Sequence, residues 1–467
     1  MATQTELSTR LRASLKGPVS GLGDLGLTST LRGVRAEDIA EASRHLSHPE
    51  ILAIFNWLDN ERAAELLGLL DDEATHYIVE NAPPARVTDM LDRLPMDDAA
   101  DVLDEASPEK AEELLRSLAR TAPDDADEIR DLLSYPERSA GRLMTDAFMR
   151  LRPDMSVNEA FAAVRESDDE VETLSDLYIT EQVEGDREIL IGVISLRELV
   201  RAGARRKDPN VKIRDFMVTD VISVLVDTDQ EECARLISKY DFMALPVLER
   251  GGNFVGIVTV DDIIDVLVEE GTEDVLALGA VTPTEKPYLA NSIFDLFKQR
   301  FGWLLLLFVA ESFTGFVLRN YAAEVEKVVA LSFFVPLLIG SGGNAGAQAV
   351  TTITRALALG EVSFRDLLKV IWREARTGLA LGLALGLVGF VRVLFWGNGA
   401  DLALVIGLSQ LVVIVWAVTV GAGLPMIFKR MGLDPAVMSA PFITTLVDAT
   451  GLVFYFSIAR VILHQLH

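Results

Sequence analysis

The chain has 467 residues, 50% of them hydrophobic, and its 43 basic and 70 acidic side chains give a formal net charge of −27. Only 13 of the basic and 10 of the acidic residues lie from Tyr288 onward, which leaves 30 and 60 in residues 1–287. The strong negative charge of residues 1–287 argues against binding to nucleic acid, because it would repel the phosphates. The chain has a single cysteine, Cys233, so an internal disulfide is excluded.

A repeat follows the first residues of the chain. Residues 1–35 are expected to be a flexible segment, and they begin without the apolar core of a signal peptide. Within each 12-residue unit the apolar positions are 5, 8, 9 and 12, the spacing of a short amphipathic helix. The units begin with residues that are typical of helix caps: Ser47, Asp59, Asp71, Pro83, Pro95 and Ser107. The pattern predicts an acidic superhelical domain over 36–133.

Two related units come next, over 134–203 and 204–275, each with a predicted β-α-β-β-α order. This order and the ending GIVTVDD resemble cystathionine-β-synthase (CBS) domains. The resemblance implies a regulatory pair, with ATP as a candidate ligand. It also implies a ribose contact for Asp262 in Thr259-x-x-Asp262, and for the matching Ser195-x-x-Glu198. The same spacing is that of a helix capping box, so both interpretations stay open.

An acidic stretch closes the second CBS unit. Asp262, Asp265 and Glu269 are spaced to share one helical face, where like charges repel one another. Cations would relieve this repulsion, and an ordinary solvated helix face is the alternative. Residues 276–300 are then expected to be a linker whose last part, from Tyr288 to Arg300, is a short amphipathic helix meeting the first membrane span.

The apolar pattern of residues 301–467 predicts an all-α transmembrane domain with five helices. Its apolar segments each approach or exceed the ~20 residues that cross a bilayer, and they cover 302–318, 328–354, 377–396, 402–428 and 437–463. Basic residues gather between the second and third spans and between the fourth and fifth. The positive-inside rule therefore places the N-terminus in the cytoplasm and the C-terminus outside the cell membrane.

The second span is unusually polar and rich in glycine over 336–352. Glycines such as Gly343 weaken a helix and allow another backbone to come close. Asn344 and Gln348 are four residues apart, so they share one face. Polar groups at membrane depth are tolerated where they face protein or a water-filled path.

The fifth span carries an acid near its middle. Asp434 is predicted to cap the helix, and Asp448 follows Thr444 and Thr445 by about one turn. A carboxylate at this depth requires water, a cation or a partner, so Asp448 is a candidate ion-binding group. Glu311 in the first span is the other mid-span acid. Because Mg²⁺ keeps several of its waters, one Asp from each of two subunits would suit it.

From about residue 36 onward the chain resembles the MgtE family of magnesium channels. The resemblance rests on the order of the blocks and on the strings YPERSAGRLMT, GSGGNAGAQ and DPAVMSAPFITTLVDATG. It implies a homodimer in a lipid bilayer, whose pore lies between the second and fifth spans of both subunits. Departures occur at Ala347 and Ala440, where the family usually has Asn. The residues expected at the pore are Asp448, Thr444, Thr445, Gly343, Asn344 and Gln348.

The resemblance also implies a gate, in which cytoplasmic Mg²⁺ bridges acidic residues and shuts the pore. By position, the expected ligands near the linker are Asp262, Asp265, Glu269, Glu270 and Asp274. Their expected partners on the helical array are Asp97, Asp98 and Asp101. Mg²⁺ is thus expected to be both the transported ion and a ligand of the sensor.

Three other functions remain as alternatives. A CBS-regulated secondary carrier for another cation or solute would have more titratable groups in its spans. An intramembrane protease would need two acids that share a proton, and Glu311 and Asp448 could serve only if their helices touch. The third alternative is a magnesium sensor with a silent membrane anchor. The whole pattern predicts a multi-domain transport protein and no enzyme.

Overall fold

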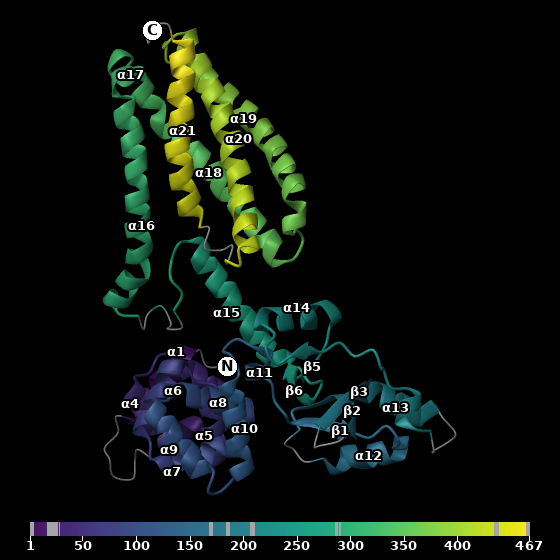
Figure 1. Ribbon diagram of the computed structural model, residues 1–467. Coiled ribbons are helices and arrows are strands. Elements are labelled where there is room, and N and C mark those ends of the chain that lie inside the picture. The colour runs from purple at the N-terminus through teal and green to yellow at the C-terminus, as the bar shows by residue number, and fades with distance from the viewer. Residues whose placement is uncertain are drawn as a thin grey trace. The chain divides into compact units, whose positions relative to one another are not determined.

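The computed structural model describes residues 4–15, 27, 29–167, 171–183, 187–205, 211–284, 288, 291–433 and 439–463. It forms two compact units, the first reaching residue 270 and the second beginning at residue 271 (Figure 1). The predicted cap at Asp434 lies outside the described residues.

The first unit opens with the helical array that the repeat predicts. Its repeat helices are α4 (His48–Trp57), α5 (Asn60–Gly68), α6 (Asp72–Asn81), α7 (Pro84–Leu91), α8 (Met96–Asp104) and α9 (Pro108–Leu118). Each starts 12 residues after the one before, one residue past the expected cap. The Asp59 side chain accepts the N–H of Arg62, and Asp71 accepts that of Ala74. The repeat is therefore confirmed, and α3 (Ala36–Ser43) and α10 (Pro123–Ser134) flank it.

The expectation of a flexible segment over 1–35 is wrong for residues 4–15, which form helix α1 (Gln4–Leu15). Leu11 is fully buried in the core of the array, and Leu7 and Leu15 pack against the same core. The guanidinium of Arg12 donates a hydrogen bond to the carbonyl of His45 at 2.6 Å. Leucines spaced four apart give this polar helix one apolar edge, which is enough to dock it.

The CBS pair forms the rest of the first unit, and its last helix continues past residue 270 into the second unit. Its first member contains β1 (Phe148–Leu151), α12 (Val157–Glu166), β2 (Thr173–Val183), β3 (Arg187–Ser195) and α13 (Leu196–Arg205). Its second contains β4 (Val224–Leu225), α14 (Gln230–Tyr240), β5 (Ala244–Leu248), β6 (Phe254–Thr259) and α15 (Val260–Leu278). In each sheet the first strand is parallel to the second, which is antiparallel to the third. The β-α-β-β-α order is confirmed. The short helix α11 (Ala140–Leu143) leads into the pair.

The second unit has five helices long and apolar enough to cross a membrane among the described residues. Its helices are α16 (Ile293–Asn320), α17 (Ala322–Lys327), α18 (Ala330–Ala358), α19 (Leu367–Phe395), α20 (Ala400–Arg430) and α21 (Ala440–Ile462). Helices α18 to α21 form one bundle, and α16 stands at its edge beside α21 (Figure 1).

The predicted linker helix is not separate from the first span. Helix α16 runs without a break from Ile293 to Asn320, so the amphipathic stretch and the span form one element. Gly302 is the weakest helix former near their junction. A single glycine costs about 1 kcal/mol in a helix, which is too little to end one of this length.

Candidate functional site

Helices α18 and α21 approach each other closely at the predicted glycines. A β-carbon added at Gly343 would lie 2.6 Å from Cγ2 of Thr444, and one added at Gly346 would lie 2.9 Å from Cγ2 of Ile443. Such distances are far below van der Waals contact, so only glycine fits at these two positions. The glycine-rich stretch therefore places the Asn344 and Gln348 segment directly beside the helix that carries Asp448.

One face of α18 is both polar and exposed. Asn344 and Gln348 share it, as expected, and Gly340, Thr351 and Arg355 continue it along the helix. Exposed amide groups on a membrane-spanning helix are unfavourable against hydrocarbon. This face therefore requires water or another protein surface, and no described residue of the chain covers it.

Asp448 lies on α21, one turn after two threonines. The hydroxyls of Thr444 and Thr445 donate to the carbonyls of Ala440 and Pro441, at 2.9 and 3.1 Å. Their protons are thus used within the helix, and their oxygens remain acceptors. The Oδ1 atom of Asp448 is buried and has no hydrogen-bond partner among the described residues. A buried carboxylate oxygen without a donor is costly, so it suits a cation or water ligand.

Glu311 of α16 is the group whose charge acts on Asp448. Helix α16 packs on α21, so the two helices do touch. However, Oδ1 of Asp448 has no hydrogen-bond partner among the described residues, so this oxygen makes no bond to Glu311. The charge of Glu311 opposes that of Asp448, and a cation between the two acids would relieve this repulsion.

A second group of acids lies in the first unit. Helix α8 of the array carries Asp97, Asp98 and Asp101, and all three act electrostatically on one another or on Asp262 of α15. Residues more than 160 positions apart in the sequence are thus brought to one interface. Oδ1 of Asp97 is buried and without a hydrogen-bond partner among the described residues.

The pKa values at this interface show its strain. Desolvation, and then repulsion from Asp262, raise the pKa of Asp98 to about 7. Desolvation also raises the pKa of Asp262 to about 6, although the Thr259 hydroxyl donates to its Oδ2 at 2.5 Å. Desolvation likewise raises the pKa of Asp97, with Asp98 and Asp262 adding to the effect. Burial and repulsion from neighbouring acids therefore both oppose the ionisation of these three carboxylates.

The remaining expected sensor residues lie elsewhere on α15. Asp265 and Glu269 are exposed. Glu269 and Glu270 are within ion-pair distance of Arg138, and Asp274 belongs to the second unit. In the part of the chain that the structure describes, no three acidic, His or Cys side chains converge closely enough to hold a metal ion.

The sequence interpretation missed two arginines in the segment 135–145. Arg142 is 7% exposed and contacts both Asp101, at 3.0 Å, and Asp104. Arg138 faces the acidic stretch of α15. Basic residues are outnumbered in this acidic region, so each arginine is expected to pair with acids. This imbalance was the signal available in the sequence.

The two motifs that could serve as a helix cap or a ribose contact, at Glu198 and at Asp262, have different surroundings. Ser195 accepts the backbone N–H of Glu198 at 3.3 Å, and Glu198 pairs with Arg201 at 2.6 Å, as expected of a helix start. Around Asp262 the neighbouring charges are Asp261, Glu172 and Asp101. Such surroundings fit a cation better than a phosphate-bearing nucleotide.

A helical array, a CBS pair and five apolar helices with an acid at membrane depth define a multi-pass membrane transporter with a large polar part. Family models match over the same blocks: MgtE, divalent cation transporter, at 335–458; the MgtE intracellular N domain at 34–138; and CBS at 140–205 and 213–269. The chain is 35% identical to the magnesium transporter MgtE of Thermus thermophilus, over 98% of this chain and 99% of that protein. It is 30% identical to the magnesium transporter MgtE of Bacillus subtilis, over 94% of each. The chain belongs to the MgtE family, a family of transporters and not of enzymes.

Solved structures also resemble part of the chain. One is the cytosolic domain of the Mg²⁺ channel MgtE in complex with ATP, 32% identical, with a TM-score of 0.49 over 56% of this chain and 100% of that one. Another is the soluble part of a magnesium transporter, 29% identical, with a TM-score of 0.48 over 57% and 99% of the two chains.

Proposed function

We propose that this chain is a magnesium transporter of the cell membrane, in which Mg²⁺ passes Asp448 along a path between α18 and α21 of two subunits. The observation that carries the proposal is the buried Oδ1 of Asp448, which has no hydrogen-bond partner among the described residues. A carboxylate at membrane depth is retained where it meets an ion or water. Two such carboxylates on a symmetry axis balance the charge of one Mg²⁺.

The polar face of α18 supports a homodimer with a wet interface. Asn344 and Gln348 are exposed in the single chain, although their helix spans the membrane. Amide oxygens and threonine oxygens can accept the water protons of a hydrated ion, and Mg²⁺ gives up its water reluctantly. The basic loops after α18 and α20 support a cytoplasmic position for the first unit.

A gate controlled by Mg²⁺ is the second part of the proposal. Asp97, Asp98 and Asp262 repel one another across the contact between α8 and α15. A divalent cation held by these residues, together with Asp101, supplies the missing positive charge and draws the array and the CBS pair together. At low Mg²⁺ the repulsion loosens the contact. Channel-like flux that falls as cytoplasmic Mg²⁺ rises is the expected behaviour.

ATP is a second proposed ligand of the CBS pair, and it rests on the family resemblance. The acids around Asp262 disfavour the triphosphate of ATP at this position, so we propose that Asp262 binds Mg²⁺. A contact between Asp262 and the ribose of ATP stays a prediction.

The test uses purified protein in liposomes loaded with a magnesium dye, at a fixed membrane potential. Wild type is compared with Asp448→Ala and Asp448→Asn, and with Asp401→Asn as the control. Asp401 is an exposed acid in the first turn of α20. Flux should vanish in both Asp448 variants and persist in the control.

Unchanged flux in the Asp448 variants would remove this residue from the path. Raising Mg²⁺ to millimolar on the sensor side should reduce wild-type flux, and a constant flux would contradict the gate. If wild type carries no Mg²⁺ at all with the membrane potential intact, the alternative of a CBS-regulated carrier for another solute takes its place.

A further inference from the structure

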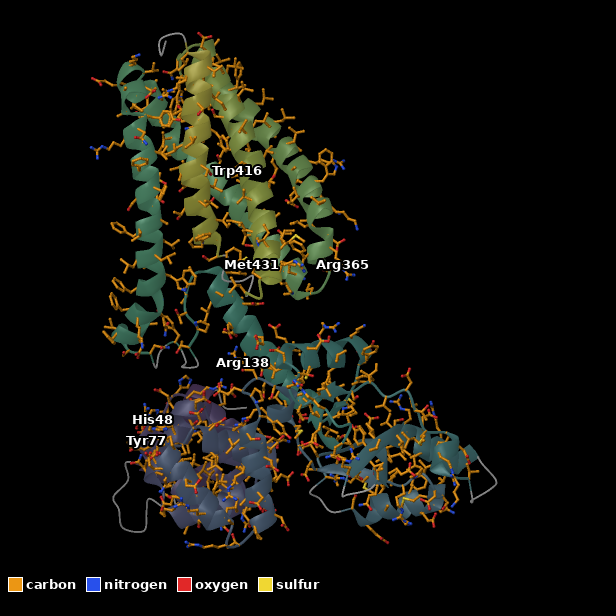
Figure 2. All side chains as sticks on the ribbon, viewed as in Figure 1. His48, Tyr77, Arg138, Arg365, Trp416 and Met431 are labelled. Carbon is orange, nitrogen blue, oxygen red and sulfur yellow. The ribbon has the colours of Figure 1, made fainter. Side chains whose placement is uncertain are left out.

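Arg138 has an unusual backbone. Its φ is +58°, in the left-handed region that residues other than glycine rarely adopt. Such a conformation persists where neighbouring contacts determine it. The carbonyl of Arg138 accepts the backbone N–H of Gln230 at 2.9 Å, and Gln230 is 4% exposed at the start of α14. This bond from the second CBS domain therefore holds the backbone of Arg138, which is labelled in Figure 2.

The side chain of Arg138 is directed at the acidic stretch of α15. Its Nη2 lies 3.2 Å from Oε1 of Glu269, and its Nη1 lies 4.0 Å from Oε1 of Glu270. The amide of Gln230 donates to the same Oε1 of Glu270 at 2.7 Å. Arg138 thus offsets the charge of two carboxylates, and the buried amide of Gln230 positions one of them. The family resemblance assigns both carboxylates to cation binding.

The two arginines of this segment differ in accessibility. Arg142 is 7% exposed and lies within reach of Asp101 and Asp104, so its own buried charge depends on these two partners. The Arg138 side chain is 50% exposed, and that of Glu269 is 52% exposed. An ion pair so open to water is weak. A divalent cation can therefore replace Arg138 far more readily than Arg142.

We propose that Arg138 is an exchangeable internal counter-cation for Glu269 and Glu270, and that a divalent metal ion must displace it to bind there. This inference rests on the proposed function. It assigns Arg138 a role in setting the Mg²⁺ concentration at which α15 responds. Without Arg138, the two carboxylates are free for the ion at a lower concentration.

The test is a Mg²⁺ titration of the full chain in lipid nanodiscs, followed by hydrogen exchange of peptides from α15. Arg138→Gln should lower the Mg²⁺ midpoint about two- to fivefold, the worth of one exposed ion pair. Arg138→Lys keeps the positive charge, so its Mg²⁺ midpoint should fall between those of wild type and Arg138→Gln. Arg235→Gln is the matched control, since Arg235 is 50% exposed and pairs with Glu232 of its own helix α14.

High monovalent salt provides a second readout, because screening weakens the Arg138 pair. The midpoints of wild type and Arg138→Gln should converge at about 1 M KCl, and a purely structural role would not produce this convergence. A midpoint that stays the same or rises in Arg138→Gln overturns the inference while the proposed gate stands. A wild type whose α15 does not respond to Mg²⁺ overturns both.

Discussion

Gly343 of α18 and Thr444 of α21 lie so close that a β-carbon on residue 343 would come within 2.6 Å of the Thr444 Cγ2 atom. Thr444 belongs to the turn of α21 that precedes Asp448, and its hydroxyl is already bonded within that turn. The close approach therefore fixes the part of α21 that leads to Asp448 directly beside α18.

Gly343→Ala should force α18 and α21 apart and abolish most Mg²⁺ flux. Overpacking of this kind costs about 1–3 kcal/mol, and the shift also moves Asp448. Gly315→Ala on α16 is the control, because a β-carbon there meets nothing within 4 Å. The liposome assay measures both variants. Normal flux in Gly343→Ala would show that the contact is not needed for transport.

Arg142→Gln should weaken the docking of α8 on the segment before the CBS pair. The change leaves Asp101 and Asp104 without their guanidinium. Breaking a buried pair costs about 3–5 kcal/mol, and the partial exposure of both acids reduces this to about 1–3 kcal/mol. Limited proteolysis of the array should be faster in this variant. Arg201→Gln, which breaks an exposed pair with Glu198, should leave the cleavage rate unchanged.

Asp98→Asn should stabilise the magnesium-free contact between α8 and α15. Desolvation and Asp262 raise the pKa of Asp98 to about 7, so ionisation of this group opposes the contact at neutral pH. Its removal should increase the free energy of opening by about 1 kcal/mol. Mg²⁺ should then protect the region less than in wild type. Hydrogen exchange of α8 with and without Mg²⁺ measures both effects, and equal protection by Mg²⁺ in the variant would remove Asp98 from the sensor.

Glu128 of α10 should make the stability of the first unit depend on pH. Desolvation, and then repulsion from Asp146, raise its pKa to about 8 from an ordinary value of 4.5. The folded protein therefore keeps a proton that the unfolded chain loses, so stability falls as pH rises from about 5 to 8 and levels off above 8.

Glu128→Gln removes this penalty. Near pH 8 the variant should be more stable than wild type by about 1–2 kcal/mol, a figure reduced for solvent screening. The difference should shrink as the pH falls to about 4 and below, where wild-type Glu128 is protonated in both states. Hydrogen exchange of α10 across this pH range is the measurement. Parallel curves for the two proteins would show that Glu128 is ionised in the fold.

The sequence alone determined the elements whose signal is local. A 12-residue apolar period predicted six helices at their correct starts, since burial of positions 5, 8, 9 and 12 requires only neighbouring turns. Five long apolar runs predicted five spans for the same reason, because length and composition decide whether a helix suits a bilayer. The order of strands and helices in both CBS units was equally readable.

Tertiary structure decided what depends on distant residues. No local pattern could pair Asp98 with Asp262, or Arg142 with Asp101, because these contacts arise when separate domains pack. Nor could it show that α1 docks on the array, or that α16 continues from the linker into the membrane. The charge of each acid was evident from the sequence. Only the fold decided which acids lie close together and are buried. Repulsion between two charges depends on their distance and on desolvation, and neither can be read from the sequence.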